Sequence, residues 1–389
     1  MPTTPSLVSD CASSASPSRV AKSTTLFRAW KDRAKVVMAD IGIPPSNVID
    51  HFDRLYKLEV PSILVQGPLP PSFLHDEPEF RSRVKTWAST ISTVEEDEFG
   101  ILAALPILAF AFRRIRNTSN NRSKEHAQRR GIDDIIELAF SARRDRHCDF
   151  RVEESYRLVE SPGNPDAVSD TLVTIPSTTI AYKIDLARTL FQDPSTADHL
   201  YWSTGASKDG FSIIGLAGEF KKDEDDSNMN QAIMALATAQ AQRKALGLKD
   251  SIIMGAIASR GCVQIFSSYW TSENSPSCVC IHAHKQLFDL SEPSQLIHLY
   301  VFFSKLERDF QGTLALELKT LSIPTETAIQ DHQCRIPDHS RKRRRTEAGE
   351  GSSAGNRGEA GGNGGVVDAD GFDGDYHMDI MKWRDEVVK

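Results

Sequence analysis

The stretch that decides the fold is Ser212-Ile213-Ile214-Gly215-Leu216-Ala217-Gly218-Glu219-Phe220-Lys221. Its first part is continuously apolar, which is typical of a central strand covered on both faces, and only its end is charged. Residues two apart on a strand point to the same face, so Glu219 and Lys221 share a face. We therefore predict a buried strand that ends in a carboxylate and an ammonium group.

A second strand is predicted upstream, over residues 180–186. Apolar side chains alternate on one of its faces, at Ile180, Tyr182, Ile184 and Leu186. The opposite face carries Asp185, which meets Glu219 if the two strands pair.

A helix is predicted after the charged turn 222–226, from about Met229 to Ala245. Either Ser227 or Asn228 can cap its first turn. The helix carries Gln231 near its start. An amide thus joins two carboxylates and an ammonium group at one place.

These groups suit a metal-dependent reaction on a phosphodiester. Two carboxylates match the oxygen ligands that Mg²⁺ prefers, and the backbone carbonyl of Phe220 can add another. A bound cation lowers the pKa of its water and stabilises the charge that builds on a phosphodiester. An ammonium group such as Lys221 can position that water or neutralise the phosphate.

This arrangement resembles the PD-(D/E)xK nuclease superfamily, in which an aspartate on one strand and Glu-x-Lys on the next precede a helix that often carries glutamine. It is most similar to the nuclease-like domain of many fungal proteins of unknown function, over about residues 120–315. The resemblance implies an α/β (α+β) class and a restriction-endonuclease-like fold, a mixed sheet flanked by helices. It also implies one or two divalent ions, Mg²⁺ or Mn²⁺, and hydrolysis of DNA or RNA in active members.

The same resemblance assigns roles to the residues quoted above. Asp185 and Glu219 are expected to bind metal, Lys221 to position or activate water, and Gln231 to support the site. Superfamily members often add an acid from a helix before the first core strand.

That helix is predicted here from Lys124 to Ala142, because its isoleucines recur with partial helical periodicity. Glu125 is the candidate for the extra acid, and Asp133 and Glu137 are its rivals.

The expected function is therefore Mg²⁺-dependent hydrolysis of nucleic-acid phosphodiester bonds. The alternative is a catalytically inactive scaffold that binds protein or nucleic acid. A third possibility is a structural interaction protein built on the helical N-terminal region.

Composition places these elements in a chain of 389 residues, 40% hydrophobic and 25% charged, as in soluble proteins. We expect disorder over 1–24, a helical accessory region over 25–115, the nuclease-like domain over 116–320 and a disordered tail over 321–389. The longest apolar run, 101–112, is too short to cross a bilayer, so no membrane partner is expected.

The charged residues and the cysteines indicate which partners and which cellular location to expect. A net charge of −7 means that any nucleic-acid binding must be local. The basic cluster from Arg113 to Arg130 either grips phosphate or is a solvated linker. The run Arg341–Arg345 matches a nuclear-import signal, and the six scattered cysteines suit a reduced nuclear or otherwise cytoplasmic protein.

Further strands are predicted at 251–259, 262–270 and 277–283, followed by a closing helix over 294–311. The third strand alternates cysteine and histidine, at Cys278, Cys280, His282 and His284. Residues two apart on a strand lie about 6 to 7 Å apart, so these four cannot converge on one tetrahedral zinc ion. A plain strand is favoured.

Overall fold

The structure, a computed structural model, describes residues 15–38, 44–67, 78–119, 125–141, 148–159, 166–176, 212–221, 226–245, 251–271 and 278–320. All of these belong to one compact unit, Met1–Ile336. Asp185 and its predicted strand lie outside the described residues, as do the tail 321–389 and its basic run Arg341–Arg345.

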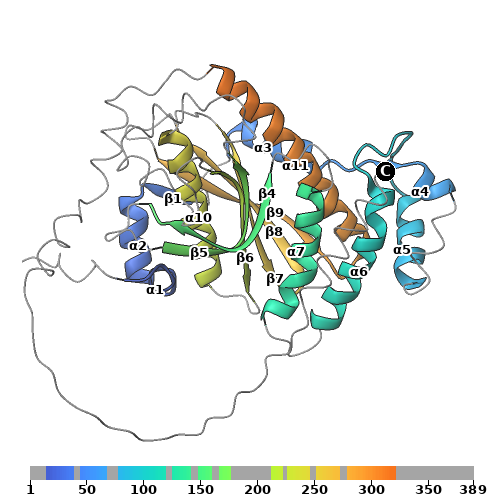
Figure 1. The fold of residues 1–389 in the computed structure, drawn as a ribbon, viewed down its shortest axis with the longest axis horizontal. Coiled ribbons are helices and arrows are strands. Elements are labelled where there is room, and N and C mark those ends of the chain that lie inside the picture. Colours follow the sequence, from blue (N-terminus) through green and yellow to red (C-terminus); the bar gives the residue numbers. More distant parts are fainter. Residues whose placement is uncertain are drawn as a thin grey trace, which may run out of the picture. The chain divides into compact units, whose positions relative to one another are not determined.

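A seven-stranded mixed sheet forms the centre of this unit, in the order β1-β9-β8-β7-β6-β5-β4 (Figure 1). Two of its pairs, β1–β9 and β6–β7, are parallel, and the others are antiparallel. The strands are β1 (Val36–Met38), β4 (Asp149–Arg157), β5 (Asp166–Pro176), β6 (Ser212–Lys221), β7 (Ile253–Ser259), β8 (Cys262–Trp270) and β9 (Val279–Asp289).

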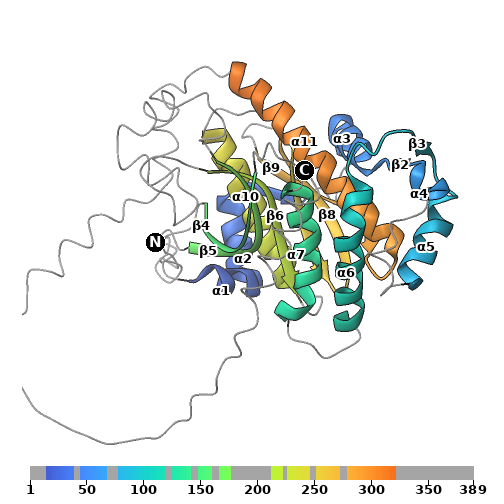
Figure 2. The ribbon, with the colours of Figure 1, turned by 45° about the vertical axis from the view of Figure 1, so that its right-hand side comes forward.

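Helices cover both faces of the sheet (Figures 1 and 2). One face packs against α10 (Asp226–Ala245), with α1 (Pro17–Lys22) and α2 (Thr24–Arg33). The other packs against α3 (Ser46–Tyr56), α7 (Glu125–Ser141) and α11 (Pro293–Thr320), and α4 (Ile63–Gln66), α5 (Pro78–Ala88) and α6 (Ile101–Ser119) extend the same core beyond these helices. The prediction of a mixed sheet flanked by helices is confirmed at this level.

The central strand β6 has the bounds that its sequence predicts. Leu216 is fully buried in the core beneath α11, whereas Ala217 is buried in the core beneath α10. An apolar run that must face two layers explains why its hydrophobic residues do not alternate with polar ones.

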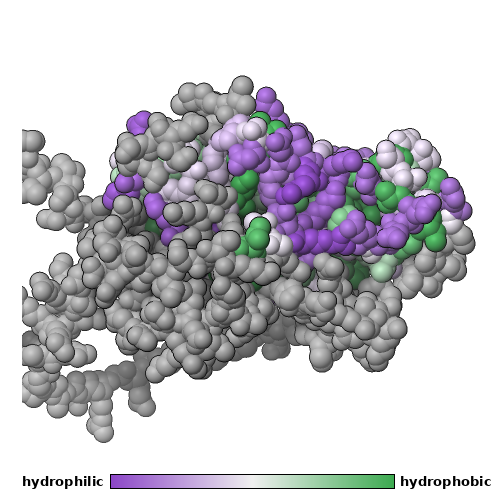
Figure 3. Space-filling model, turned by 90° about the horizontal axis from the view of Figure 1, so that it is seen from above, coloured by the Kyte–Doolittle hydropathy of each residue, from purple (hydrophilic) through white to green (hydrophobic). Residues whose placement is uncertain are grey.

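The α11 face is built from large side chains. Phe302, Phe303 and Leu306 of α11 are fully buried, and the Phe303 ring lies 6.0 Å from that of Phe140 on α7. The predicted closing helix is therefore present, and it continues nine residues further, to Thr320 rather than 311. Seen from above, the described surface is mostly hydrophilic, with hydrophobic residues in small patches (Figure 3).

The α10 face combines small residues with buried polar ones. Gln240 on α10 donates to the carbonyls of Ser251 (3.0 Å) and Ser268 (2.7 Å). The Gln242 side-chain carbonyl accepts from the backbone N–H of Ile214 at 2.8 Å. These bonds pair groups that the helix would otherwise bury without partners.

The N-terminal region differs from its prediction in two respects. Residues 17–22 form α1, although 1–24 were expected to be disordered, because Ser16 caps the first turn and Val20 and Ala21 are buried. The region 25–115 is not helical throughout. Val36–Met38 extends the main sheet as β1, and Val60–Pro61 (β2) pairs in parallel with Thr93–Val94 (β3).

Among the described helices, none has the length and apolar content needed to cross a bilayer.

Candidate functional site

The charged end of β6 lies on the α10 side of the sheet. Glu219 is two residues beyond Ala217, and its side chain is buried, 2% exposed. Burial raises the pKa of Tyr156 on β4 well above its usual value, and the negative charge of Glu219 raises it further. Glu219 and Tyr156 are therefore electrostatic neighbours within one buried layer.

The two neighbours of β6 behave differently at this end. Parallel pairing with β7 continues to Lys221, which lies opposite Ser259. Antiparallel pairing with β5 ends earlier, at Thr171 opposite Gly218. The sheet therefore opens on one side of β6 just where Glu219, Phe220 and Lys221 begin.

Side chains of β5 replace the missing backbone bonds at this opening. A carboxylate oxygen of Asp170 accepts the backbone N–H of Phe220 at 2.7 Å. The Ser169 hydroxyl lies 3.1 Å from the Gly218 carbonyl and 3.0 Å from the Thr171 carbonyl, to which it can donate. In an antiparallel ladder the N–H and C=O of one residue point to the same neighbouring strand. We therefore expect the Phe220 carbonyl to face the same opening as Asp170.

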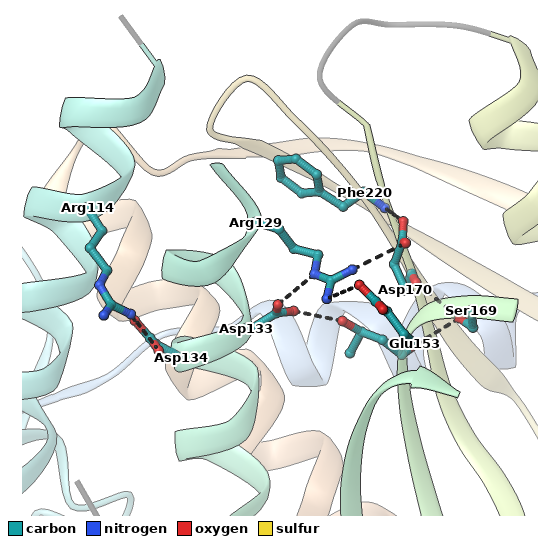
Figure 4. A network of polar contacts seen from close by, with 10 residues as sticks. Arg114, Arg129, Asp133, Asp134, Glu153, Ser169, Asp170 and Phe220 are labelled. Atoms are coloured by element: carbon teal, nitrogen blue, oxygen red, sulfur yellow. Dashed lines mark hydrogen bonds and ion pairs between the residues drawn. The ribbon is translucent and has the colours of Figure 1, made fainter. Parts of the chain in front are cut away.

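An arginine on α7 contacts Asp170 and two further carboxylates near this opening (Figure 4). The Arg129 guanidinium lies 2.8 Å from Asp133, 3.3 Å from Asp170 and 3.3 Å from Glu153. Its side chain is only 12% exposed. The Thr171 hydroxyl donates to Asp133 at 2.8 Å, which ties α7 to β5. We call Arg129, Asp133, Glu153 and Asp170 the Arg129 cluster; one cation in it faces three carboxylates.

Burial and charge act against each other in this cluster. Burial raises the pKa of Asp133 to about 6, although Arg129 and the Thr171 hydroxyl favour its ionised form. Burial lowers the pKa of Arg129, but the nearby carboxylates outweigh that effect and raise it. Arg129 therefore stays charged, and Asp133 titrates near neutral pH.

Glu153 reaches the cluster from an unusual backbone conformation. It lies between Val152 and Glu154, which pair with Thr171 and Ser169, and its φ is 53°. This left-handed region costs a residue with a side chain about 1 to 2 kcal/mol. Glu153, with its strained backbone, lies beside the part of β5 where β5 and β6 separate.

The structure places the other predicted residues as follows. Lys221 ends β6, and Gln231 is partly buried in the second turn of α10. Gln231 precedes Thr238 by seven residues and so shares its side of the helix. The hydroxyl of Thr238 lies 3.4 Å from the Val159 N–H, just past the strand that carries Tyr156.

The three candidate acids on α7 lie at different positions along the helix axis. Glu125 is its first residue and is partly buried. Asp133 lies eight residues on, about 12 Å along the axis, and its carboxylate accepts a hydrogen bond from the Thr171 hydroxyl of β5. Glu137 follows one turn later and is partly buried.

Sequence reasoning did not find Asp170 or Tyr156, and it included Arg129 only as a member of the basic cluster from Arg113 to Arg130. The signal for Asp170 was the apolar run Leu172–Ile175 directly after Ser169-Asp170-Thr171, which indicates a strand with an acid at its start. That strand, β5, is the sequence neighbour of β6 among the described strands.

The predicted metal ligands are oxygen donors, as Mg²⁺ requires, and Glu219 and Phe220 adjoin on β6. Within the described segments, no group of three or more His, Cys, Asp or Glu residues is arranged to hold a metal ion. Asp185, the other predicted ligand, lies outside those segments.

The alternation of cysteine and histidine is part of β9, so the prediction of a plain strand is confirmed. Some of its members contact one another, because the His282 and His284 ring centroids lie 4.9 Å apart. His284 lies 2.6 Å from the Ser267 hydroxyl and stacks on Phe52, with ring centroids 3.6 Å apart. Cys278 contacts the Thr271 hydroxyl at 3.0 Å.

The basic cluster around α6 forms ion pairs within the fold. Arg114 binds Asp134 of α7 at 2.9 Å, and Arg116 binds Glu79 of α5. These pairs join neighbouring helices, which is a structural role.

Comparison with protein-family models, with curated proteins and with solved structures gives no match for this chain.

Proposed function

We propose that the chain is a Mg²⁺-dependent nuclease of the PD-(D/E)xK type that acts at the end of β6. The observation that carries this proposal is the opening of the sheet at Gly218, beside the buried carboxylate of Glu219. The chain order gives further support: α7 with its acids, β5, the Glu-x-Lys strand β6, α10 with Gln231, and then β7 parallel to β6.

Asp185, Glu219 and the Phe220 carbonyl would hold the cation. When bound, such an ion lowers the pKa of a water molecule and stabilises negative charge on phosphate. Lys221, two residues after Glu219, would orient the attacking water. Among the α7 acids, Asp133 supports the site better than Glu125, because Asp133 contacts Thr171 at the opening.

Nucleic acid, DNA or RNA, is the proposed substrate. The full chain is acidic, with a net charge of −7, so binding depends on a local cationic surface.

We also propose that Arg341–Arg345 directs the protein to the nucleus. Replacement of this run by alanine should leave a fluorescent fusion in the cytoplasm.

The test is calorimetric titration of Mn²⁺ into the full chain, wild type against Glu219→Gln. The matched control is Glu154→Gln, which removes a strand carboxylate that pairs with Arg151 on β4. We expect Glu219→Gln to lose Mn²⁺ binding and the control to keep it, with unchanged far-UV circular dichroism in both. Labelled single- and double-stranded DNA and RNA then show which substrate is cut.

A second candidate is an inactive scaffold that binds nucleic acid or protein without cleavage. The observation in its favour is that the described residues alone do not complete a metal-binding group. Equal Mn²⁺ binding in wild type and Glu219→Gln, or none in either, would favour this scaffold and overturn the nuclease proposal.

A further inference from the structure

We propose that Asp170 is a positioning residue for the Glu219–Lys221 segment, and that Arg129 holds Asp170 in place. This inference deepens the proposed function and rests on it for its consequence for metal binding. Asp170 acts here through the backbone of β6, and it is given no role as a metal ligand.

The first step is that Asp170 takes over where the backbone ladder stops. The last β5–β6 pair is Thr171 with Gly218, so the Phe220 N–H lies two residues beyond the end of that ladder. The Asp170 carboxylate accepts it at 2.7 Å, within the range of a charge-assisted bond. A side chain thereby extends the contact between β5 and β6 into the opening.

The second step is what this bond fixes. The Phe220 N–H belongs to the peptide unit that joins Glu219 to Phe220, and peptide units are planar. Holding that plane restricts rotation on both sides of it. The Glu219 side chain and the Phe220 carbonyl lie on either side of that plane, so fewer directions are open to each.

The third step is that Asp170 is itself held. Its other carboxylate oxygen lies 3.3 Å from Arg129, which also binds Asp133 one turn further along α7. The helix has little room to move, because a side chain added at Gly131 would meet the Ile115 side chain at 2.6 Å and the Ala111 backbone oxygen at 3.0 Å. Arg129 is therefore anchored to a helix packed tightly on α6.

The structure offers a matched control in the same helix. Asp134 follows Asp133 but binds Arg114 on α6 at 2.9 Å, away from β6 (Figure 4). Both aspartates lie on α7 and pair with an arginine, but only the pair of Asp133 with Arg129 leads to the Glu-x-Lys segment. Asp134→Asn therefore measures the loss of an ion pair without loss of the positioning contact.

The first experiment measures hydrogen exchange of the Phe220 amide in the full chain without metal. Asp170→Ala should exchange faster there by about tenfold, the equivalent of one lost hydrogen bond to a charged group. Asp170→Asn keeps an acceptor oxygen and should restore protection, and Asp134→Asn should match wild type. If Asp170→Ala does not fold, Arg129→Gln replaces it, with a smaller increase expected.

The second experiment measures Mn²⁺ affinity of the same variants. Loss of a residue that orients ligands typically weakens metal binding about 10- to 100-fold, so Asp170→Ala should fall in that range and Asp170→Asn should recover most of it. Unchanged Phe220 exchange in Asp170→Ala, or an equal change in Asp134→Asn, would overturn the positioning role. Absence of Mn²⁺ binding in wild type would overturn the proposed function alone, because the exchange result stands without metal.

Discussion

The two faces of the central sheet are covered by different kinds of side chain. The α11 face holds aromatic and aliphatic side chains such as Phe302 and Phe303, both fully buried. The α10 face holds alanines together with buried polar groups such as Gln240 and Glu219. Apolar packing on the first face stabilises the fold without directional bonds, whereas the second depends on hydrogen bonds that fix positions. The Glu219 carboxylate of the candidate site lies on this second face, where hydrogen bonds fix the positions of side chains.

The largest expected effect comes from the α11 face. Phe303→Ala should lower the free energy of unfolding by about 3 to 5 kcal/mol, because it leaves a cavity among Phe140, Phe302 and their neighbours. Urea denaturation measures this loss. The exposed Leu316 provides the control, since Leu316→Ala should change stability by less than about 0.5 kcal/mol. Similar losses in both variants would break the distinction between core and surface on this helix.

A smaller effect is expected from the α10 face. Gln240→Leu keeps the volume but leaves the carbonyls of Ser251 and Ser268 without the amide that binds them, which should cost about 2 to 3 kcal/mol. The control is Lys244→Gln one turn later, where an exposed ammonium lies 4.0 Å from the Trp270 ring centre and contributes about 0.5 to 1 kcal/mol. A gain of stability in Gln240→Leu would show that this face, too, is held by apolar packing.

The α11 face also predicts sensitivity to acid. Burial lowers the pKa of His284 to about 3, from 6.5 in the unfolded chain, so below pH 6.5 the unfolded state binds more protons and stability falls. At pH 5 the contribution of His284 alone is a loss of about 2 kcal/mol. Burial likewise lowers the pKa of His51 and His298, which act in the same direction.

Urea denaturation from pH 7.5 to pH 5 tests this expectation, with wild type compared to His284→Gln. The variant should lose less stability on acidification, and His126→Gln, at an exposed position of α7, should behave as wild type. Asp133 acts in the opposite direction, because its raised pKa favours proton uptake by the folded state below pH 6. That contribution is common to all three proteins and cancels in the comparison. Parallel pH profiles for wild type and His284→Gln would contradict the prediction.

Sequence patterns predicted the elements whose environment is uniform. β6, β8 and α10 are buried along most of their length, and the predicted bounds match the observed ones to within three residues. β4 and β5 were missed, because Arg151, Glu153 and Glu154 interrupt the apolar pattern of a strand that lies at the edge of the sheet. Edge strands carry such charges, and local propensity does not distinguish them from loops.

The candidate site shows the same limit. Glu219 followed from strand periodicity alone, whereas Asp170 becomes relevant only once the register sets Thr171 opposite Gly218. Glu125 was chosen from its place in the helix, whereas the hydrogen bond from Asp133, two turns further on, to Thr171 of β5 becomes visible only in the folded chain. Distances across strands and helices depend on tertiary packing, which a single sequence does not display.

The pairing of β1 with β9 has a consequence for synthesis of the chain. Val36 lies beside Val279, so the first strand of the sheet cannot find its partner until more than 240 residues have followed it from the ribosome. At about 5 to 20 residues per second, this takes roughly 12 to 50 seconds. Throughout that time Val36–Met38 is an unmatched apolar segment, and we expect chaperones that bind nascent chains to occupy it until β9 emerges.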